Sequence, residues 1–188
     1  MICPIFAYGH PILRVKATPI APGTHVQELV NRMVSTMHHA QGVGLAAPQI
    51  GQSIRLFVAN WGNPSIRETC HETTHQVFIN PIIRIDKAAP ITRQEEGCLS
   101  IPHIMVEVPR REQVRISYFD SQWQWHEKVW TGFAARVLQH EYDHLEGILH
   151  IDYAAYLKKR LMKRRLIAIN NGQVTTAYKM NFSRKQHA

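Results

Sequence analysis

The chain has 188 residues, of which 45% are hydrophobic and 19% are charged, and its formal net charge at pH 7 is +8. This composition is typical of a folded globular protein and excludes a disordered chain. The charge indicates attraction to an anionic partner, such as nucleic acid, a ribosome or a membrane surface, but carries no information about chemistry.

The N-terminal stretch lacks the basic and apolar regions of a signal peptide, since Pro4 and Pro11 interrupt it early. No apolar run reaches the length of a membrane span, so we expect no membrane association. The cysteines are odd in number and widely spaced, which does not fit a disulfide framework: Cys3, Cys70 and Cys98. A reducing, cytoplasmic location fits best.

The first elements follow from turn and capping signals. Residues 1–23 contain four prolines and are expected to form an extended lead-in. Thr24 and Gln27 form a capping box for a first helix that should extend to Gly42. The glycine-rich stretch that starts there is typical of a tight turn or of close backbone approach to a ligand, and Gln49 is its one polar side chain that can reach into a site.

Alternating patterns predict several strands in the middle of the chain, at residues 54–60, 76–80, 82–86, 106–108, 113–120 and 122–129. The polar stretch 61–74 is expected to be a surface loop. His71 and His75 lack an apolar helical stripe around them, which argues against a metal site there. Cys98 lies between two predicted strands, and a cysteine in such a place is more often a buried small residue than a ligand.

His140 and His144 stand four residues apart with Glu141 after the first, so a helix places both imidazoles on one face. Apolar residues continue the same stripe toward the interior, Phe133 and Val137. Two imidazoles can bind one metal, and a catalytic metal also needs a third protein ligand, an open position for water and a carboxylate such as Glu141. The alternative is a chance pentad on a surface helix.

Gly147 is expected to end this helix, and residues 148–151 to form a short strand. A last helix is predicted from Tyr153 to Asn171, with apolar Leu157 and Leu161 on one side. Its other face carries six basic residues, Lys158, Lys159, Arg160, Lys163, Arg164 and Arg165. This face is either simply solvated or docks on RNA or a ribosome.

The order of these elements favours an α+β fold with antiparallel β-sheets around a central metal-binding helix, an N-terminal helix and a basic C-terminal helix. We expect one catalytic domain over residues 1–188, in which residues 153–188 form the basic helix and an edge strand within 173–180.

Three stretches together resemble the peptide deformylase family: Gly-Val-Gly-Leu-Ala-Ala-Pro-Gln at 42–49, Glu-Gly-Cys-Leu-Ser at 96–100 and Gln-His-Glu-Tyr-Asp-His at 139–144. They occur in the family's order, and the likeness runs from about Pro4 to the basic helix. The resemblance implies a metal-dependent amidase that removes the formyl group from N-formylmethionyl peptides and releases formate. It also implies that Cys98 joins His140 and His144 as the third ligand.

The same resemblance implies Fe²⁺ as the metal, with Zn²⁺, Ni²⁺ or Co²⁺ as substitutes. Glu141 would activate a water on the metal, and the Gln49 amide and the Leu99 N–H would meet the developing oxyanion. Substrate contacts would come from Val43, Gly44 and Val137. Two positions depart from many relatives, which have arginine where this chain has Met105 and an acidic residue where it has Gln41.

The expected partners are N-formylmethionyl peptides and, through the basic helix, the ribosome; DNA is not expected. Opposite charges flanking Cys98 predict that Glu96 and Arg110 pair and hold the thiolate. Two alternatives stay open. One is a metalloprotease that cuts internal peptide bonds, and the other is a basic RNA-binding module whose structural metal is closed by a fourth protein ligand.

Overall fold

The computed structural model describes residues 1–62 and 75–183. Three α-helices occur in these two ranges, α1 (Gln27–His39), α2 (Gly132–Leu145) and α3 (Tyr156–Asn170). The strands are β1 (Ile5–Phe6), β2 (Gly44–Ala46), β3 (Leu56–Ala59), β4 (Gln76–Ile85), β5 (Ile91–Cys98), β6 (Ile101–Arg111), β7 (Gln113–Phe119), β8 (Trp125–Thr131) and β9 (Met180–Asn181). Short 3-10 helices are η1 (Pro11–Arg14), η2 (Ala47–Ile50) and η4 (His150–Tyr153).

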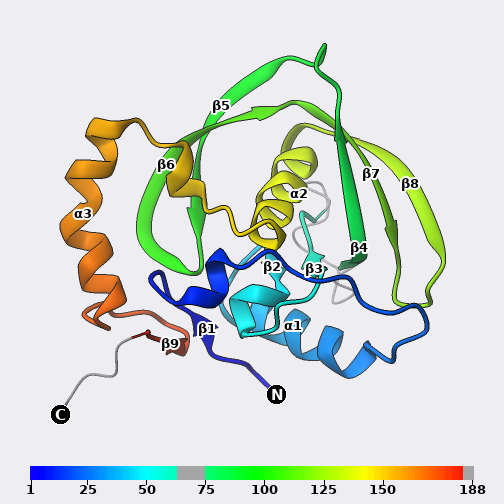
Figure 1. The fold of residues 1–188 in the computed structure, drawn as a ribbon, viewed down its shortest axis with the longest axis horizontal. Helices are drawn as coiled ribbons and strands as arrows, with labels where there is room; N and C mark the ends of the chain where they lie inside the picture. The colour runs from blue at the N-terminus through cyan, green and yellow to red at the C-terminus, as the bar shows by residue number, and fades with distance from the viewer. Residues whose placement is uncertain (63–74, 184–188) are drawn as a thin grey trace.

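The strands form three sheets, and α2 lies between the five-stranded sheet and the β5–β6 hairpin (Figure 1). A five-stranded antiparallel sheet has the order β2-β3-β4-β7-β8, and β5 and β6 form a separate antiparallel hairpin. Strands β1 and β9 pair in parallel near the two ends of the chain. The predicted α+β fold with antiparallel sheets packed around a central helix is therefore confirmed.

Helix α2 is the most buried helix of the described chain. Eight of its residues are buried, Ala135, Arg136, Val137, Leu138, Gln139, Glu141, His144 and Leu145. Gly147 follows the helix with a φ of 72°, as expected for a residue that ends a helix in the left-handed region. A Cβ at this position would lie 2.7 Å from the Arg14 carbonyl oxygen, so close packing also requires glycine.

The N-terminal predictions were correct in outline and wrong in detail. Helix α1 is present, but its N-cap is Val26, which makes no side-chain capping bond, and the Thr24 hydroxyl instead donates to the Ala21 carbonyl at 2.7 Å. The predicted capping box is therefore wrong. The glycine-rich stretch is more than a turn, because it contains the buried strand β2 and the 3-10 helix η2.

Three strand assignments need correction. Strand β4 runs without a break through Pro81, with a register shift between Ile79 and Ile82, where two strands were expected. Strand β5 was not predicted, because its residues are mostly polar and exposed and lack an apolar alternation. Residues 148–151 form no strand; the chain enters η4 there instead.

The C-terminal helix also differs from its prediction. Helix α3 begins at Tyr156, and Leu157 and Leu161 are 71% and 81% exposed, so they do not form its inner face. Its buried residues are Leu166 and Ile169, which pack in a core cluster with the β6 residues Ile101, Ile104, Val106 and Val108. Of the edge strand predicted within residues 173–180, only Met180 is paired, as the first residue of β9.

Among the described helices, not one has the length and hydropathy of a membrane span. His71, Cys70 and most of the predicted loop 61–74 lie outside the described residues. Cys3 and Cys98, the two cysteines within them, are free thiols.

Candidate metal centre

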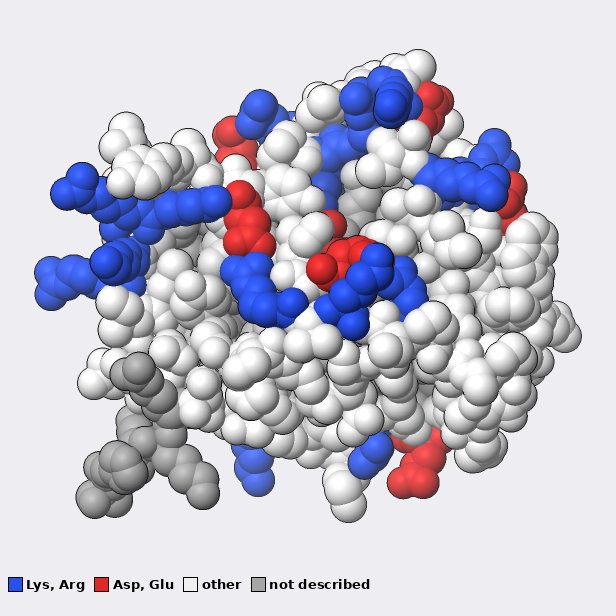
Figure 2. All heavy atoms as spheres, viewed as in Figure 1, with Lys and Arg blue, Asp and Glu red and all other residues white. Residues whose placement is uncertain are grey.

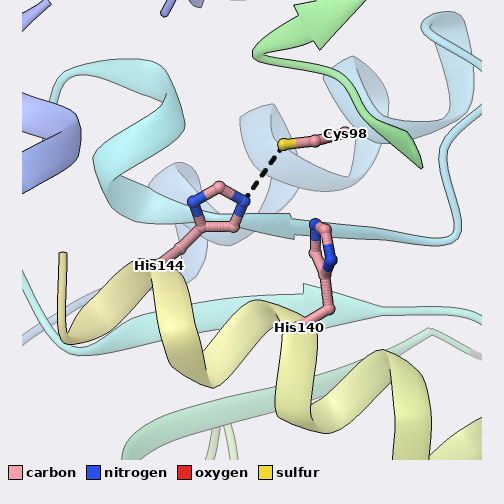
Figure 3. A group of neighbouring side chains, drawn as sticks. All are labelled: Cys98, His140 and His144. Atoms are coloured by element: carbon pink, nitrogen blue, oxygen red, sulfur yellow. Dashed lines mark hydrogen bonds between the residues drawn. The ribbon is translucent and has the colours of Figure 1, made fainter. Parts of the chain in front are cut away.

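Cys98, His140 and His144 meet on the inner side of α2 (Figure 3). One ligand atom from each residue, the thiol sulfur and one ring nitrogen of each histidine, lies within 4.8 Å of the other two, and the Cys98 Sγ lies 3.3 Å from the Nε2 of His144. The helix supplies both imidazoles because they are one turn apart, and the end of β5 supplies the thiol. The three side chains converge on a volume that suits one divalent ion.

A hairpin bulge places the thiol. The β5–β6 register shifts between Glu96 and Cys98, at Gly97, next to the turn into β6. A Cβ on Gly97 would lie 2.9 Å from the Met105 sulfur, so a side chain there would push against the facing strand. Glu96 and Cys98 lie two residues apart on the strand and both contact residues of α2.

Glu96 fixes the orientation of His140. Its Oε2 accepts a hydrogen bond from the His140 Nδ1 at 3.0 Å, so the proton of the neutral ring lies on Nδ1 and the Nε2 lone pair is left for a cation. Arg110 donates two further bonds to this carboxylate, at 3.0 and 2.9 Å, and Arg136 donates one at 2.7 Å. The predicted pairing of Glu96 with Arg110 is confirmed.

The electrostatics of the cluster favour an ionised thiolate. Burial opposes ionisation of Cys98, but the charge of His144 and hydrogen bonds with the surrounding imidazoles outweigh it and hold the pKa of the thiol well below its usual range. Burial also disfavours a charged Glu96, yet the hydrogen bonds from His140 and Arg110 lower the pKa of that carboxyl. A thiolate and two oriented imidazoles are a ligand set for a transition metal.

Glu141 lies beside the three ligands and has an unusual environment. Its side chain is 4% exposed, and its Oε2 has no hydrogen-bond partner within the described chain. Burial raises the pKa of Glu141 to about 7. A carboxyl of this kind exchanges protons near neutral pH, as a general acid and base must.

Gln49 points its amide toward the cluster because its oxygen is already used. The Ala46 N–H donates to the Gln49 Oε1 at 2.8 Å, which turns the NH₂ group toward the Ser100 hydroxyl at 3.3 Å and the Cys98 Sγ at 3.7 Å. The donor is therefore held by η2 at the edge of the metal cluster.

A cleft of about 530 Å³ opens onto these groups. The predicted residues that line it are Val43, Gly44, Gln49, Cys98, Leu99, Val137, His140 and Glu141. Gly44 lies so close to Glu141 that an added Cβ would be 2.3 Å from the Glu141 Oε1. His144 is 1% exposed and is not among the residues that line the cleft.

Several residues of the centre were not identified in the sequence. Phe133 was expected to be buried, but it is 55% exposed and lines the cleft instead. His150 is buried, donates from Nε2 to the Ile104 carbonyl at 3.2 Å and contributes to the lowered pKa of Cys98. Tyr178 and His39 also line the cleft. No short-range spacing connects His39, His150 or Tyr178 to the histidine pentad.

The chain matches a family model described as polypeptide deformylase over residues 2–160. The peptide deformylase of Christiangramia forsetii is 42% identical, with 100% of both chains covered, and that of Salinibacter ruber is 43% identical over 95% of this chain and 93% of its own.

Solved structures are also similar. The crystal structure of peptide deformylase from Thermus thermophilus has a TM-score of 0.79 at 38% identity and covers 90% of this chain and 98% of its own. A Met-Ala-Ser-bound class I type b peptide deformylase from Acinetobacter baumannii has a TM-score of 0.72 at 34% identity, covering 82% of this chain and 99% of its own.

Proposed function

The chain belongs to the polypeptide deformylase family, metal-dependent enzymes that remove the N-formyl group from nascent peptides, and we propose that Cys98, His140 and His144 hold the metal for this reaction. The observation that carries the proposal is the convergence of three ligand atoms within 4.8 Å beside a buried carboxylate whose Oε2 has no hydrogen-bond partner within the described chain. A closed structural metal site would need a fourth protein ligand, and no further cysteine, histidine or carboxylate of the described chain joins this cluster.

The metal, when bound, supplies a Lewis acid that makes water nucleophilic near neutral pH and polarises a carbonyl. Glu141 takes a proton from the attacking water through its free Oε2 and later gives it to the leaving amine, which becomes the new N-terminus. The Gln49 amide donates to the formyl oxygen as negative charge develops on it, and the Leu99 N–H is assigned the same role.

Different residues of the cleft are assigned to the formyl group and to the methionine. Val43, Gly44 and Val137 line it next to Glu141, and we assign them to the methionine side chain and its backbone. The formyl carbon carries only hydrogen, so we assign it to the end of the cleft beside Glu141, where a larger acyl group would need more room. The relative with bound Met-Ala-Ser supports a peptide of this kind as the occupant of the cleft.

We propose Fe²⁺ as the metal in the cell, with Zn²⁺, Ni²⁺ and Co²⁺ as substitutes. One thiolate and two imidazoles accept all four ions, so the support for iron comes from the family resemblance. Metal analysis of protein purified without oxygen checks this assignment: iron is expected at about one ion per chain, the stoichiometry of a single site.

The basic helix α3 supports a contact with the ribosome. All six of its predicted basic residues are exposed, and Lys and Arg side chains project from the edge of the molecule where α3 lies (Figure 2). Such a surface binds phosphate groups through counterion release. We propose that the chain acts as one domain, in the cytoplasm, on peptides that leave the ribosome.

The function is tested by formate release from formyl-Met-Ala-Ser, with acetyl-Met-Ala-Ser as the matched control. The metal-loaded protein is expected to release formate from the first and to leave the second intact. Glu141→Gln is expected to lower kcat by at least about 100-fold, the usual contribution of a general base, with the metal retained. Cleavage of an internal peptide bond without formate release would support a metalloprotease instead.

A further inference from the structure

The chain returns to the cleft after the basic helix. Residues 173–182, here called the C-terminal segment, leave α3 at Gly172 and end in β9, which pairs in parallel with β1. The Ile5 N–H donates to the Lys179 carbonyl at 2.8 Å, and the Ala7 N–H donates to the Asn181 carbonyl at 2.9 Å. The end of the segment is therefore attached to the N-terminal strand (Figure 1).

The middle of the segment lies against the candidate metal centre. Thr176, Ala177 and Tyr178 line the same cleft as Cys98 and Glu141. These residues come after position 160, where the family model's match ends. The site is thus bordered by a part of the chain that the three family motifs do not include.

Two hydrogen bonds hold the segment in this place. The Tyr178 hydroxyl donates to the Leu99 carbonyl at 2.8 Å, and the His103 Nε2 donates to the Thr175 carbonyl at 2.9 Å. Burial, followed by the charge of Cys98, raises the pKa of Tyr178 to about 12, so the phenol stays protonated and remains a donor at neutral pH. The segment is therefore fixed to the β5–β6 turn through Leu99 and to the start of β6 through His103.

We propose that the C-terminal segment is a wall of the substrate cleft that contacts the peptide beyond methionine, with Ala177 as a specificity-determining residue and Tyr178 as its anchor. The proposal rests on the proposed function. Val43, Gly44 and Val137 are assigned to the formylmethionine, so the part of the cleft lined by Thr176 and Ala177 is left for the residues that follow. Ala177 is exposed and small, which leaves space for a side chain of the peptide.

The test compares a bulky side chain at a position that lines the cleft with the same side chain at a position of the segment that does not. Ala177→Trp narrows the cleft, whereas Thr175→Trp adds the same group at an exposed position of the segment that does not line the cleft. The readout is kcat/KM for formyl-Met-Ala-Ser divided by kcat/KM for formyl-Met-Ala. We expect Ala177→Trp to lower this ratio by about fivefold to tenfold, mainly through KM, and Thr175→Trp to leave it unchanged.

Tyr178→Phe tests the anchor without removing the ring. The lost hydrogen bond should make the segment open more often, so trypsin should cleave after the exposed Lys179 about fivefold faster, with the rest of the fold intact. This readout does not depend on turnover.

The possible outcomes distinguish a failure of the proposed role of the C-terminal segment from a failure of the proposed deformylase function. If the kcat/KM ratio of Ala177→Trp stays within about twofold of the unmodified protein, or if Thr175→Trp changes it equally, the segment is not a wall of the substrate cleft. Formate release by the unmodified protein would still support the deformylase function in that case. Equal trypsin sensitivity of Tyr178→Phe and the unmodified protein would overturn the anchor. Absence of formate release from both peptides by the unmodified, metal-loaded protein would overturn the proposed function and this inference together.

Discussion

Glu96 is the centre of a buried polar network that orients the metal ligands. It is 7% exposed and accepts hydrogen bonds from Arg110, Arg136 and His140. Arg110 also donates to Asp143 at 2.6 Å, and Asp143 accepts a bond from the Tyr153 hydroxyl at 2.9 Å. The network connects the ligand strand β5, the strand β6 and the helix α2, so its integrity sets the geometry of the ligands.

The Arg110 prediction follows from this burial. Arg110→Ala leaves two carboxylates, Glu96 and Asp143, without their shared cation, and should lower the free energy of unfolding by about 3 kcal/mol or more. The release of metal to a chelator should become faster as His140 loses its fixed orientation. Urea denaturation and metal-release kinetics measure both effects.

Arg115→Ala is the matched control for this prediction. Arg115 pairs with Glu127, but its side chain is 51% exposed, so its loss should change the free energy of unfolding by less than about 1 kcal/mol. Equal effects of the two substitutions would contradict a special role for the buried network.

The pKa of Glu141 predicts the pH dependence of turnover. A general base must be deprotonated, and burial raises the pKa of this carboxyl to about 7, while a nearby cation favours its charged form. The acid limb of kcat/KM should therefore rise with pH with a limiting slope of about one and a midpoint no higher than about 7. A profile measured with formyl-Met-Ala from about pH 5 to 9 checks this, and a flat profile would be inconsistent with Glu141 as the base.

At the residue scale, local spacing predicted His140, His144 and Glu141, because one helical turn brings these side chains together. Cys98 required the family resemblance, since no local pattern distinguishes a ligand thiol from a buried one. Phe133 was placed wrongly because helical periodicity does not reveal where a cleft opens. Tyr178 could not be predicted, since a long return of the chain brings it to the site.

At the element scale, the β2 segment and α2 come so close that only glycine fits between them. A Cβ on Gly44 would be 2.3 Å from the Glu141 Oε1, whereas a Cβ on Gly42 would meet the Leu99 Cδ1 at 2.8 Å, the end of a flexible side chain. The two glycines are on the same stretch of chain but border different groups. They therefore provide a matched pair of substitutions.

Gly44→Ala should displace the Glu141 carboxylate and lower kcat by at least about tenfold, because a small misplacement of a reacting group is costly. Gly42→Ala should have a clearly smaller effect on kcat, since the leucine methyl can turn away. Steady-state kinetics measures kcat of both variants. Metal analysis run in parallel should show that both keep their metal. A larger loss of kcat in Gly42→Ala would contradict this arrangement.

The elements were predictable where one face is buried and the period is clear, as in α1, α2 and β7. Strand β5 was not, because its stability comes from pairing with β6 rather than from an apolar face. The buried face of α3 was predicted wrongly for a related reason. Its exposed leucines follow the helical period, but the helix packs through Leu166 and Ile169.

At the scale of the whole molecule, the net charge of +8 is distributed unevenly. Helix α3 contributes six exposed basic residues and no acidic one, while other basic groups, such as Arg55 and Arg110, are used in internal ion pairs. The α3 residues are exposed and therefore available for an external partner. The helix is also outside the cleft, since none of its residues lines it.

Charge reversal on α3 should therefore separate binding from catalysis. Replacing Lys158 and Lys163 by glutamate, both exposed and outside the cleft, should weaken binding to purified ribosomes by about tenfold or more and reduce its salt dependence. Turnover of formyl-Met-Ala should stay unchanged. Cosedimentation at two salt concentrations measures the effect, and unchanged sedimentation of the variant would argue against α3 as the docking surface.

The central claim is that Cys98, His140 and His144 bind one divalent ion, and the absorption spectrum of the Co²⁺-loaded protein tests it most directly. We expect about one Co²⁺ per chain, the stoichiometry of a single site, and a thiolate-to-metal charge-transfer band that disappears in Cys98→Ala but persists in Cys3→Ala. A band that survives in Cys98→Ala, or Co²⁺ binding without any thiolate band, would contradict the claim.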